Sequence, residues 1–242
     1  MPVLKDSQIW YGGYDLTSTA SEVSIDATVA TVAVTTFGDG GNVVNIAGLQ
    51  DASASVMTFL DPLISEPALS GGLGTIDLLT VSAFPTNGVL TAGDQCYALR
   101  GLLKSEKQPL KVGDAARIDA TLVEAQSEGI LRGSVLVPST SVSATGNGSV
   151  VNLGAQTSPA VAYLGIHVFG ITGDRTVTVK LQSAAAVGFA SPTDRVTTGV
   201  LSAKGSTFAT STTATTNAYW RATYTLGGTT GAVQLGIFAA IQ

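Results

Sequence analysis

The 242-residue sequence has little of the chemistry on which most enzymes rely. It contains one cysteine and one histidine, and charged residues make up 12% of it, about half the usual share for soluble proteins. A single cysteine excludes an intrachain disulfide and zinc sites built from cysteines. Cys96 lies in a short apolar run, so we expect it to be a small core residue.

A single histidine leaves only His167 for a Ser-His-Asp arrangement. It lies in the alternating segment YLGIHVF, on the face opposite the aliphatic residues, and we expect a surface or interface histidine on a strand. Metalloprotease, phosphate-loop, nucleophile-elbow and EF-hand motifs are missing. Carboxylates such as Asp119 and Glu124 lack a cleft-forming α/β pattern around them. The sequence therefore disfavours an enzyme and implies neither a cofactor nor a metal.

Long hydrophobic runs are also missing. The longest weakly polar runs, Ala27–Gly38 and Gly231–Ile241, are shorter than the roughly 20 residues that span a bilayer. Lys5 and Asp6 stand where a signal peptide would be apolar. We expect synthesis in a cytoplasm and no association with a membrane.

The charges that are present are unevenly distributed. Residues 1–137 carry 15 acidic and 7 basic side chains, a net charge of −8, whereas residues 138–242 carry 2 acidic and 5 basic ones, a net charge of +3. Within the first 99 residues, ten carboxylates accompany one base, Lys5. Phosphate affinity comes mainly from Lys and Arg, so this part should repel nucleic acid. The sparse charge also favours a surface covered by copies of the same chain.

Alternation with a period of two dominates the sequence and predicts strands. One long strand follows Glu22 and slips by one residue near Val32, which suggests a bulge. A second spans Leu49–Leu60. One short helix fits within Asp61–Ser70. The segment Asp114–Val137 reads as an antiparallel hairpin.

Composition suggests two β-rich domains. Residues 138–159 are rich in Ser, Thr, Gly and Asn and are interpreted as a linker. We expect a first domain at 1–137, with two sheets in a sandwich or barrel and one short helix, and a β-sandwich at 160–242. The fold class is therefore mainly β.

The adjacent aromatic residues Tyr219 and Trp220 are the candidates for stacking on a sugar ring. Strand alternation puts only one of them outward. Trp220 shares its phase with Ala222 and Tyr224, which favours core packing for Trp220.

Several motifs resemble one protein family. The segments GGYDL, TTFGD and GLQDASAS occupy Gly12–Leu16, Thr35–Asp39 and Gly48–Ser55. Further along, DAARIDATLVEAQSEGILRGSVL includes the pair Arg132 and Gly133. Together they resemble the tube domain of siphophage major tail tube proteins. GFASPTDRV and AYWRATYTL resemble a β-sandwich appended to many such phage proteins.

This resemblance implies a structural protein of the virion, made in the host bacterium. Its rings, hexameric or pseudo-hexameric trimeric, would stack into a tail tube through which DNA leaves. The implied partners are further copies of the chain, the tape measure protein, and tail terminator and tail tip proteins. The turn expected to contact neighbouring subunits or rings comprises Phe37, Gly38, Asp39, Gly40 and Gly41.

Charge gives a physical reason for particular lumen residues. A DNA conduit should present carboxylates inward, so that phosphate passes without adsorbing. The expected lumen residues are Asp26, Asp51, Asp119 and Glu124; the alternative for each of them is that it only solubilises the monomer. The second domain would decorate the outside, so deletion of residues 142–242 should leave tube assembly possible.

Two other functions remain open at the level of sequence. A head decoration or other virion surface protein would also be β-rich and self-associating. A carbohydrate-binding adhesion module would use Tyr219 or Trp220.

Overall fold

The computed structural model describes residues 7–33, 45–82, 88–156, 160–211, 213 and 215–242, and it is mainly β, as the sequence predicts. One five-residue helix, α1 (Ser65–Leu69), lies within the segment expected to hold it. The strands are β1 (Ile9–Tyr11), β2 (Tyr14–Asp15), β3 (Ala20–Ala33), β4 (Asn45–Phe59), β5 (Ile76–Ser82), β6 (Gln95–Lys107), β7 (Arg117–Glu124), β8 (Leu131–Val142), β9 (Gly146–Asn147), β10 (Val151–Asn152), β11 (Ala162–Ile171), β12 (Thr176–Ala184), β13 (Thr193–Thr197), β14 (Gly205–Thr210), β15 (Tyr219–Gly227) and β16 (Val233–Ile241).

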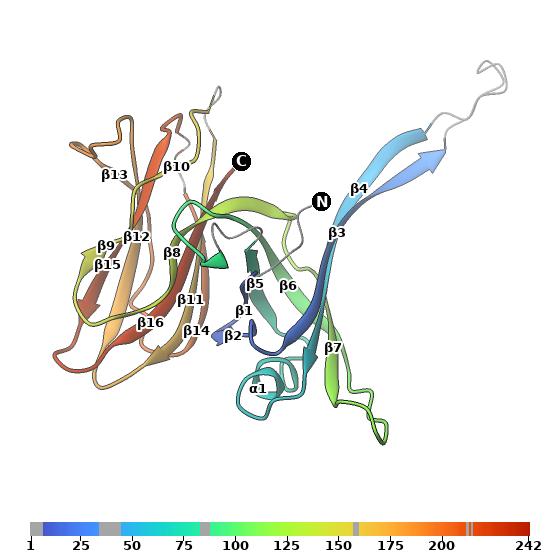
Figure 1. Cartoon of the computed structure of the whole chain (residues 1–242). Helices are drawn as coiled ribbons and strands as arrows, with labels where there is room; N and C mark the ends of the chain where they lie inside the picture. The colour runs from blue at the N-terminus through green and yellow to red at the C-terminus, as the bar shows by residue number, and fades with distance from the viewer. Residues whose placement is uncertain (1–6, 34–44, 83–87, 157–159, 212, 214) are drawn as a thin grey trace, which may run out of the picture.

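One sheet of eleven strands runs through most of the molecule, and a second sheet of five strands packs beside its C-terminal part (Figure 1). The large sheet divides at β6. One edge of β6 pairs with β5, whereas its other edge pairs first with β8 and then with β7. The N-terminal branch continues from β7 to β4 and β3, and the C-terminal branch runs from β8 through β16 and β11 to β14.

Alternating side chains build a core on one face of the N-terminal branch. On β7, for example, Ile118, Ala120 and Leu122 are buried while Arg117 is exposed. These residues pack with the small buried side chains of β4 and with Leu69 of α1. The period-2 pattern therefore dictates which face of these strands is covered.

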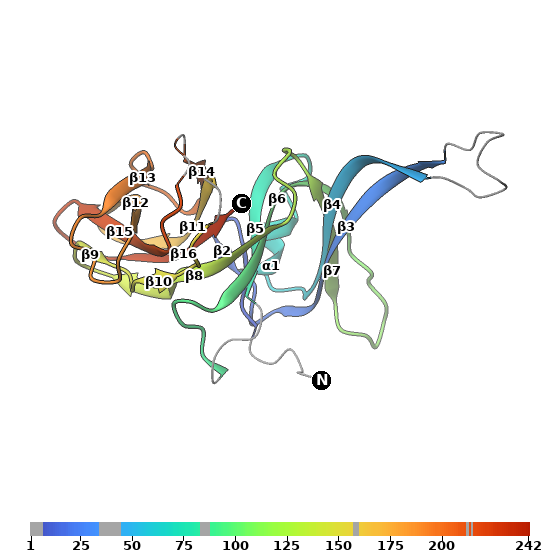
Figure 2. The ribbon, with the colours of Figure 1, turned by 90° about the horizontal axis from the view of Figure 1, so that it is seen from above.

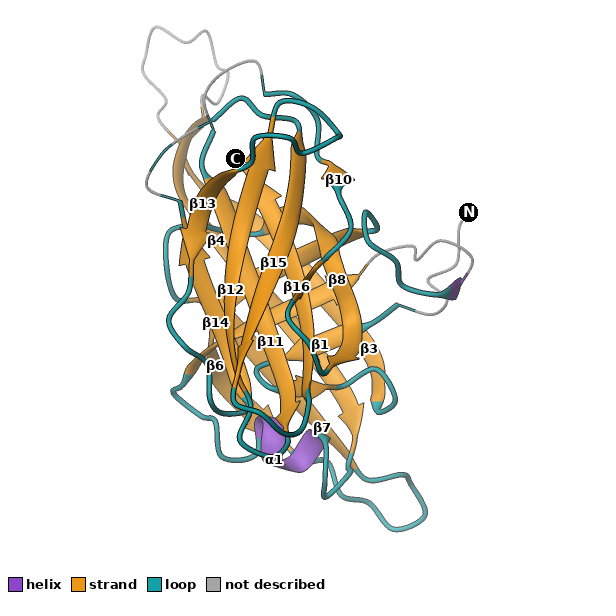
Figure 3. Cartoon of the chain, turned by 90° about the vertical axis from the view of Figure 1, so that its left-hand side faces the viewer, coloured by secondary structure: helices purple, strands orange, loops and turns teal. Residues whose placement is uncertain are grey.

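The C-terminal half is a sandwich, which we call the C-terminal sandwich. The five-stranded sheet of β9, β10, β12, β13 and β15 packs on β8, β11, β14 and β16, and the long strands of the two layers run in similar directions (Figure 3). Its core contains Val177, Val179 and Leu181 of β12 together with Trp220 of β15, all fully buried. The sandwich expected for this part of the chain is therefore present.

A third core, which we call the junction, joins the two halves. Trp10 of β1 and Leu78 of β5 pack there with Leu131 and Val135 of β8 and with Phe238 of β16. These residues come from both ends of the chain, and each is 1% exposed or less. The two halves therefore share buried apolar surface, in addition to a continuous sheet.

The expected linker is structured. Strand β8 crosses the expected boundary at residue 137, and β9 and β10 lie within residues 138–159 and pair with β15. Composition misled here because Ser and Thr suit strands as well as loops. The described part of the expected linker, residues 138–156, consequently belongs to the C-terminal sandwich.

The expected hairpin at Asp114–Val137 is wrong in its pairing. Both strands exist, but β7 pairs with β4 and β6, while β8 pairs with β6 and β16. Local alternation located both strands, but it does not show which other strands pair with them.

Candidate assembly surface

The most exposed part of the sheet is the distal part of the β3–β4 hairpin, residues 26–33 and 45–51, which we call the arm. Seen from above, it projects away from the rest of the molecule (Figure 2). Consecutive residues from Asp26 to Thr31 are all exposed, and so are Leu49, Gln50 and Asp51. Because consecutive strand residues point to opposite faces, both faces of the arm are open to solvent.

The two faces of the arm continue the two faces of the hairpin root, and they differ in polarity. One face continues the core side, with Ile25, Ala27 and Val29 opposite Ala54, Ala52 and Gln50. Val29 is 46% exposed, so this apolar stripe extends beyond the part that the chain itself covers. It is an apolar surface without a cover among the described residues.

The opposite face, which we call the outer face, is polar. Cross-strand pairs are Ser24 with Ser55, Asp26 with Ser53, and Thr28 with Asp51. The hydroxyl oxygens of Ser24 and Ser55 lie 2.7 Å apart. Serine, threonine and carboxylate side chains therefore line this face of the hairpin.

Three of the four carboxylates expected in the lumen share the outer face. Asp26 and Asp51 are exposed on the arm, and Asp119 of β7, which is half-buried, joins the same face because its register partner is Met57 of β4. Glu124 differs: it alternates onto the core side of β7, where it accepts a 2.7 Å hydrogen bond from the Gly129 amide. Glu124 therefore does not share the outer face with the other three carboxylates.

The outer edge of the sheet at β3 has no partner strand in the described part of the chain, since β3 pairs with β4 alone. Natural edge strands are often protected by lysine, proline or strong bulges. The 14 residues of β3, ASEVSIDATVATVA, contain no Lys, Arg or Pro. Two register irregularities against β4, between Ala20 and Glu22 and between Val29 and Thr31, are the only such device on this strand.

An open groove separates the root of the arm from the start of β8. Its volume is about 470 Å³, and its lining is largely apolar. The Arg132 guanidinium lies 5.5 Å from the centre of the Tyr97 ring at one side of the groove. The lining residues are Ile25, Ala27, Tyr97, Ile130 and Arg132.

The turn expected to contact neighbours, Phe37–Gly41, lies outside the described residues. In the described ranges, no three His, Cys, Asp or Glu side chains are placed to hold a metal ion, and no helix is long and apolar enough to cross a membrane.

Cys96 is fully buried, and burial raises the pKa of its thiol far above the ordinary value. The expectation of a core cysteine is therefore confirmed.

The solved structures that are similar to this chain include one from a virion and one from a phage. No family model and no curated protein matches the sequence. A chain from the virion of a native gene transfer agent particle is 16% identical, with a TM-score of 0.39 over 52% of this chain and 95% of that one. The SPP1 Dit protein, described as a paradigm of the hub adsorption apparatus in phages that infect Gram-positive bacteria, is 14% identical, with a TM-score of 0.35 over 98% and 99%. Both TM-scores are too low to assign a shared fold.

His167 is fully buried, which corrects the expectation of a surface histidine. Its Nδ1 lies 2.7 Å from the carbonyl oxygen of Gly12, and its Nε2 lies 2.8 Å from Oγ1 of Thr80. A carbonyl only accepts, so Nδ1 carries the proton and Nε2 accepts from Thr80. Burial lowers the pKa of His167 to about 4, and the Gly12 hydrogen bond opposes that shift only in part.

Alternation failed for His167 because both faces of β11 are covered. One face packs in the C-terminal sandwich, and the other meets the N-terminal half. On that second face the imidazole ring contacts Trp10 of β1 and Phe169 of β11 itself. The neighbouring β1–β2 turn approaches the start of β14 so closely that a Cβ on Gly13 would lie 2.6 Å from the Gly205 nitrogen. Gly13 of the GGYDL segment therefore serves a close approach between the halves.

Trp220 packs in the core as alternation predicts. It is fully buried, and its indole nitrogen donates a 3.0 Å hydrogen bond to the carbonyl oxygen of Asn217. Tyr219 is half-buried at the end of β15. A sugar-stacking role for Trp220 is incompatible with this burial.

Proposed function

We propose that this chain is a structural virion protein whose copies join through the N-terminal branch into stacked rings, forming the tail tube of a long-tailed bacteriophage. The observation that carries the proposal is the arm together with the edge of β3, which is protected only by two register irregularities and by the carboxylates Glu22 and Asp26. A 14-residue edge strand without Lys, Arg or Pro is a hazard for a free monomer. It suits a protein in which a neighbouring copy covers that edge.

Ring closure explains why such an edge is retained. When identical sheets join edge to edge around an axis, every edge strand gains a partner and the ring has no free edge. Main-chain hydrogen bonds then supply affinity, while side chains on alternate positions select the neighbour. The apolar stripe at Ile25, Ala27 and Val29 would be covered in the same step.

The outer face supplies the charge that a DNA conduit needs. Asp26, Asp51 and Asp119 share this face, and residues 20–59 contain no Lys or Arg. Two bases, Arg117 beside Met57 and Lys107 opposite Asp119, lie on the same face at the end of the branch near α1. A lumen lined this way repels phosphate, so DNA passes without specific binding. On this proposal, tape measure, tail terminator and tail tip proteins would contact the same assembly.

Negative-stain microscopy of the purified chain tests the proposal directly. We expect hollow tubes or stacked rings at concentrations where the chain self-associates. Discrete particles that bind only to capsids would instead favour a head decoration protein. A monomer at every concentration tested would overturn self-assembly altogether.

A further inference from the structure

Opposite charges are concentrated in two separate segments of the chain. Residues 20–59, which include the arm, contain four carboxylates and no base. Residues 104–117, which surround the β6–β7 loop, contain four of the twelve bases of the chain and two acids. We call residues 104–117 the basic loop. One segment is purely acidic and the other carries a net charge of +2.

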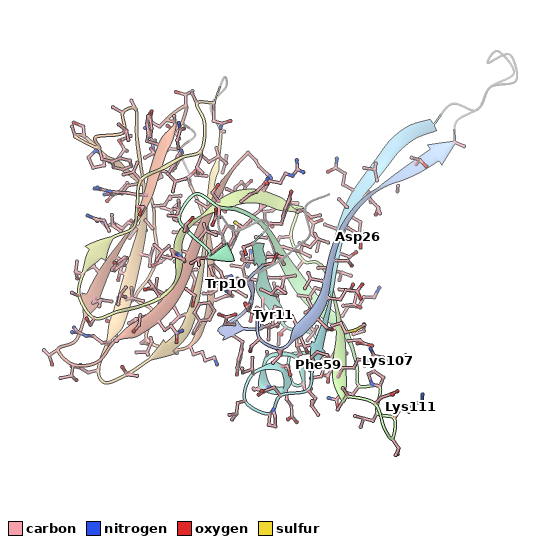
Figure 4. All side chains as sticks on the ribbon, viewed as in Figure 1. Trp10, Tyr11, Asp26, Phe59, Lys107 and Lys111 are labelled. Carbon is pink, nitrogen blue, oxygen red and sulfur yellow. The ribbon has the colours of Figure 1, made fainter. Side chains whose placement is uncertain are left out.

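The arm and the basic loop lie at opposite ends of the N-terminal branch. Asp26 lies at the root of the arm, whereas Lys107 and Lys111 lie at the other end of the N-terminal branch, on the side of α1 (Figure 4). The ion pair that the structure gives to the basic loop is Lys111 with Asp114, at 3.5 Å, with side chains 79% and 57% exposed. A pair so exposed contributes little, so the positive charge of the loop is available to another molecule.

Exposed apolar side chains accompany the charges at both ends. In the basic loop, Leu110 is 68% exposed and Val112 is fully exposed, on either side of Lys111. On the arm, Leu49 is 85% exposed and lies two residues from Asp51. Both ends therefore present the same combination, an apolar side chain beside a charge, with opposite signs of charge.

We propose that the basic loop of one copy docks on the arm of a second copy, with Lys111 facing Asp51 and Leu110 or Val112 contacting Leu49. This inference rests on the proposed self-assembly and names two surfaces that carry it; a docked Asp51 no longer faces the bore, so Asp26 and Asp119 are the carboxylates of the outer face that remain to line it. Because the two surfaces differ, the contact is heterologous and leaves a free arm and a free basic loop at the ends of any row of copies. The contact therefore repeats from copy to copy along the direction that joins the arm to the basic loop.

The chemistry of the contact defines its behaviour. Charge complementarity sets the partner and its register more than the total affinity, and salt screens charges that stay partly exposed. We expect assembly through this contact to weaken between about 0.1 M and 1 M salt.

Single charge reversals test the contact. Lys111→Glu places a like charge opposite Asp51 and should raise the critical concentration for assembly roughly tenfold. Asp51→Lys should do the same, and the double variant, in which the charges are exchanged, should return toward the wild type. Assembly is measured by sedimentation and microscopy, with circular dichroism to verify that each variant folds.

Lys180→Glu is the matched control. Lys180 is also exposed and also pairs with an aspartate, Asp194, at 2.7 Å, but it lies on the C-terminal sandwich away from both surfaces. The control should assemble as the wild type does. Carbodiimide cross-linking of mixed ¹⁵N-labelled and unlabelled protein adds an independent measurement, since we expect inter-chain links between Lys111 and Asp51.

The outcomes separate this inference from the proposed function. If the wild type forms tubes and Lys111→Glu forms them equally well, the docking of the basic loop is refuted and the tube proposal stands. An equal rise in the critical concentration for assembly in Lys180→Glu would also refute the docking of the basic loop, because the change in net charge alone would then explain the effect. If the wild type never assembles, the tube proposal and this contact both fail.

Discussion

At the scale of single residues, buried aromatic side chains carry much of the packing. Trp220 is fully buried in the C-terminal sandwich and satisfies its indole N–H within the chain. Because truncation leaves a cavity that the surrounding core fills only in part, Trp220→Ala should lower the free energy of unfolding by ~3–5 kcal/mol. Chemical denaturation measures this change. Tyr219→Ala is the neighbouring control, and an equal loss there would contradict the assignment of Trp220 to the core.

His167 gives the stability a pH dependence with a definite sign. Its pKa in the fold is about 4 against an ordinary 6.5, so the unfolded chain binds the proton more readily. The stabilisation is complete above pH 6.5, decreases as pH falls, and is lost below about 4. A shift of this size corresponds to on the order of 3 kcal/mol.

The measurement uses the fact that His167 is the only histidine. We expect the free energy of unfolding to fall between pH 6.5 and 5, where few carboxylates titrate. In His167→Gln, which is uncharged at every pH, this slope should disappear. A slope that persists in His167→Gln would assign the pH dependence to other groups.

At the scale of elements, the arm is separable from the core. Thr28 and Asp51 face each other across the hairpin, so an Asn-Gly turn joining them in place of residues 29–50 keeps the register of the remaining strands. The removed part is exposed on both faces wherever its side chains are described. We expect the free energy of unfolding to change by less than about 1 kcal/mol, while assembly is lost.

Denaturation and microscopy of this arm-shortened variant check both halves of the prediction. If the shortened chain still formed tubes, the arm would not be required for assembly. A large loss of stability would show instead that the arm supports the fold. The Thr28 and Asp51 side chains stay in place, so the new turn is the only added feature.

At the scale of the whole molecule, the two halves depend on one another. Phe238 and Ala240 of β16 belong to the junction with Trp10, and β16 pairs along most of β8. Deletion of residues 142–242 would uncover this apolar surface and the sheet edge of β8. We therefore replace the expectation of an assembling fragment by one of an insoluble or unfolded chain.

Expression of residues 1–141 tests this interdependence. A soluble fragment with a cooperative thermal transition would show that the N-terminal branch folds alone. The contrary result, aggregation of the fragment with normal behaviour of the full chain, would identify the C-terminal sandwich as part of the folding unit. In that case its removal says nothing about assembly.

The sequence by itself determined the local features of this protein. Alternation located the long strands and the burial of Trp220, because side chains on a strand point alternately to two faces. A break in that alternation located the short helix near Ser65. Composition also determined the concentration of acid in residues 20–59 and of bases in residues 104–117, since charge needs no fold to be counted.

Only the tertiary structure decided which strands meet and which faces are covered. It placed β8 and β7 one after the other along the same edge of β6, buried His167 under the N-terminal half, and turned Glu124 to the core side of β7. Pairing between distant strands and the covering of a second sheet face depend on contacts far apart in the chain, and a period of two contains no information about them.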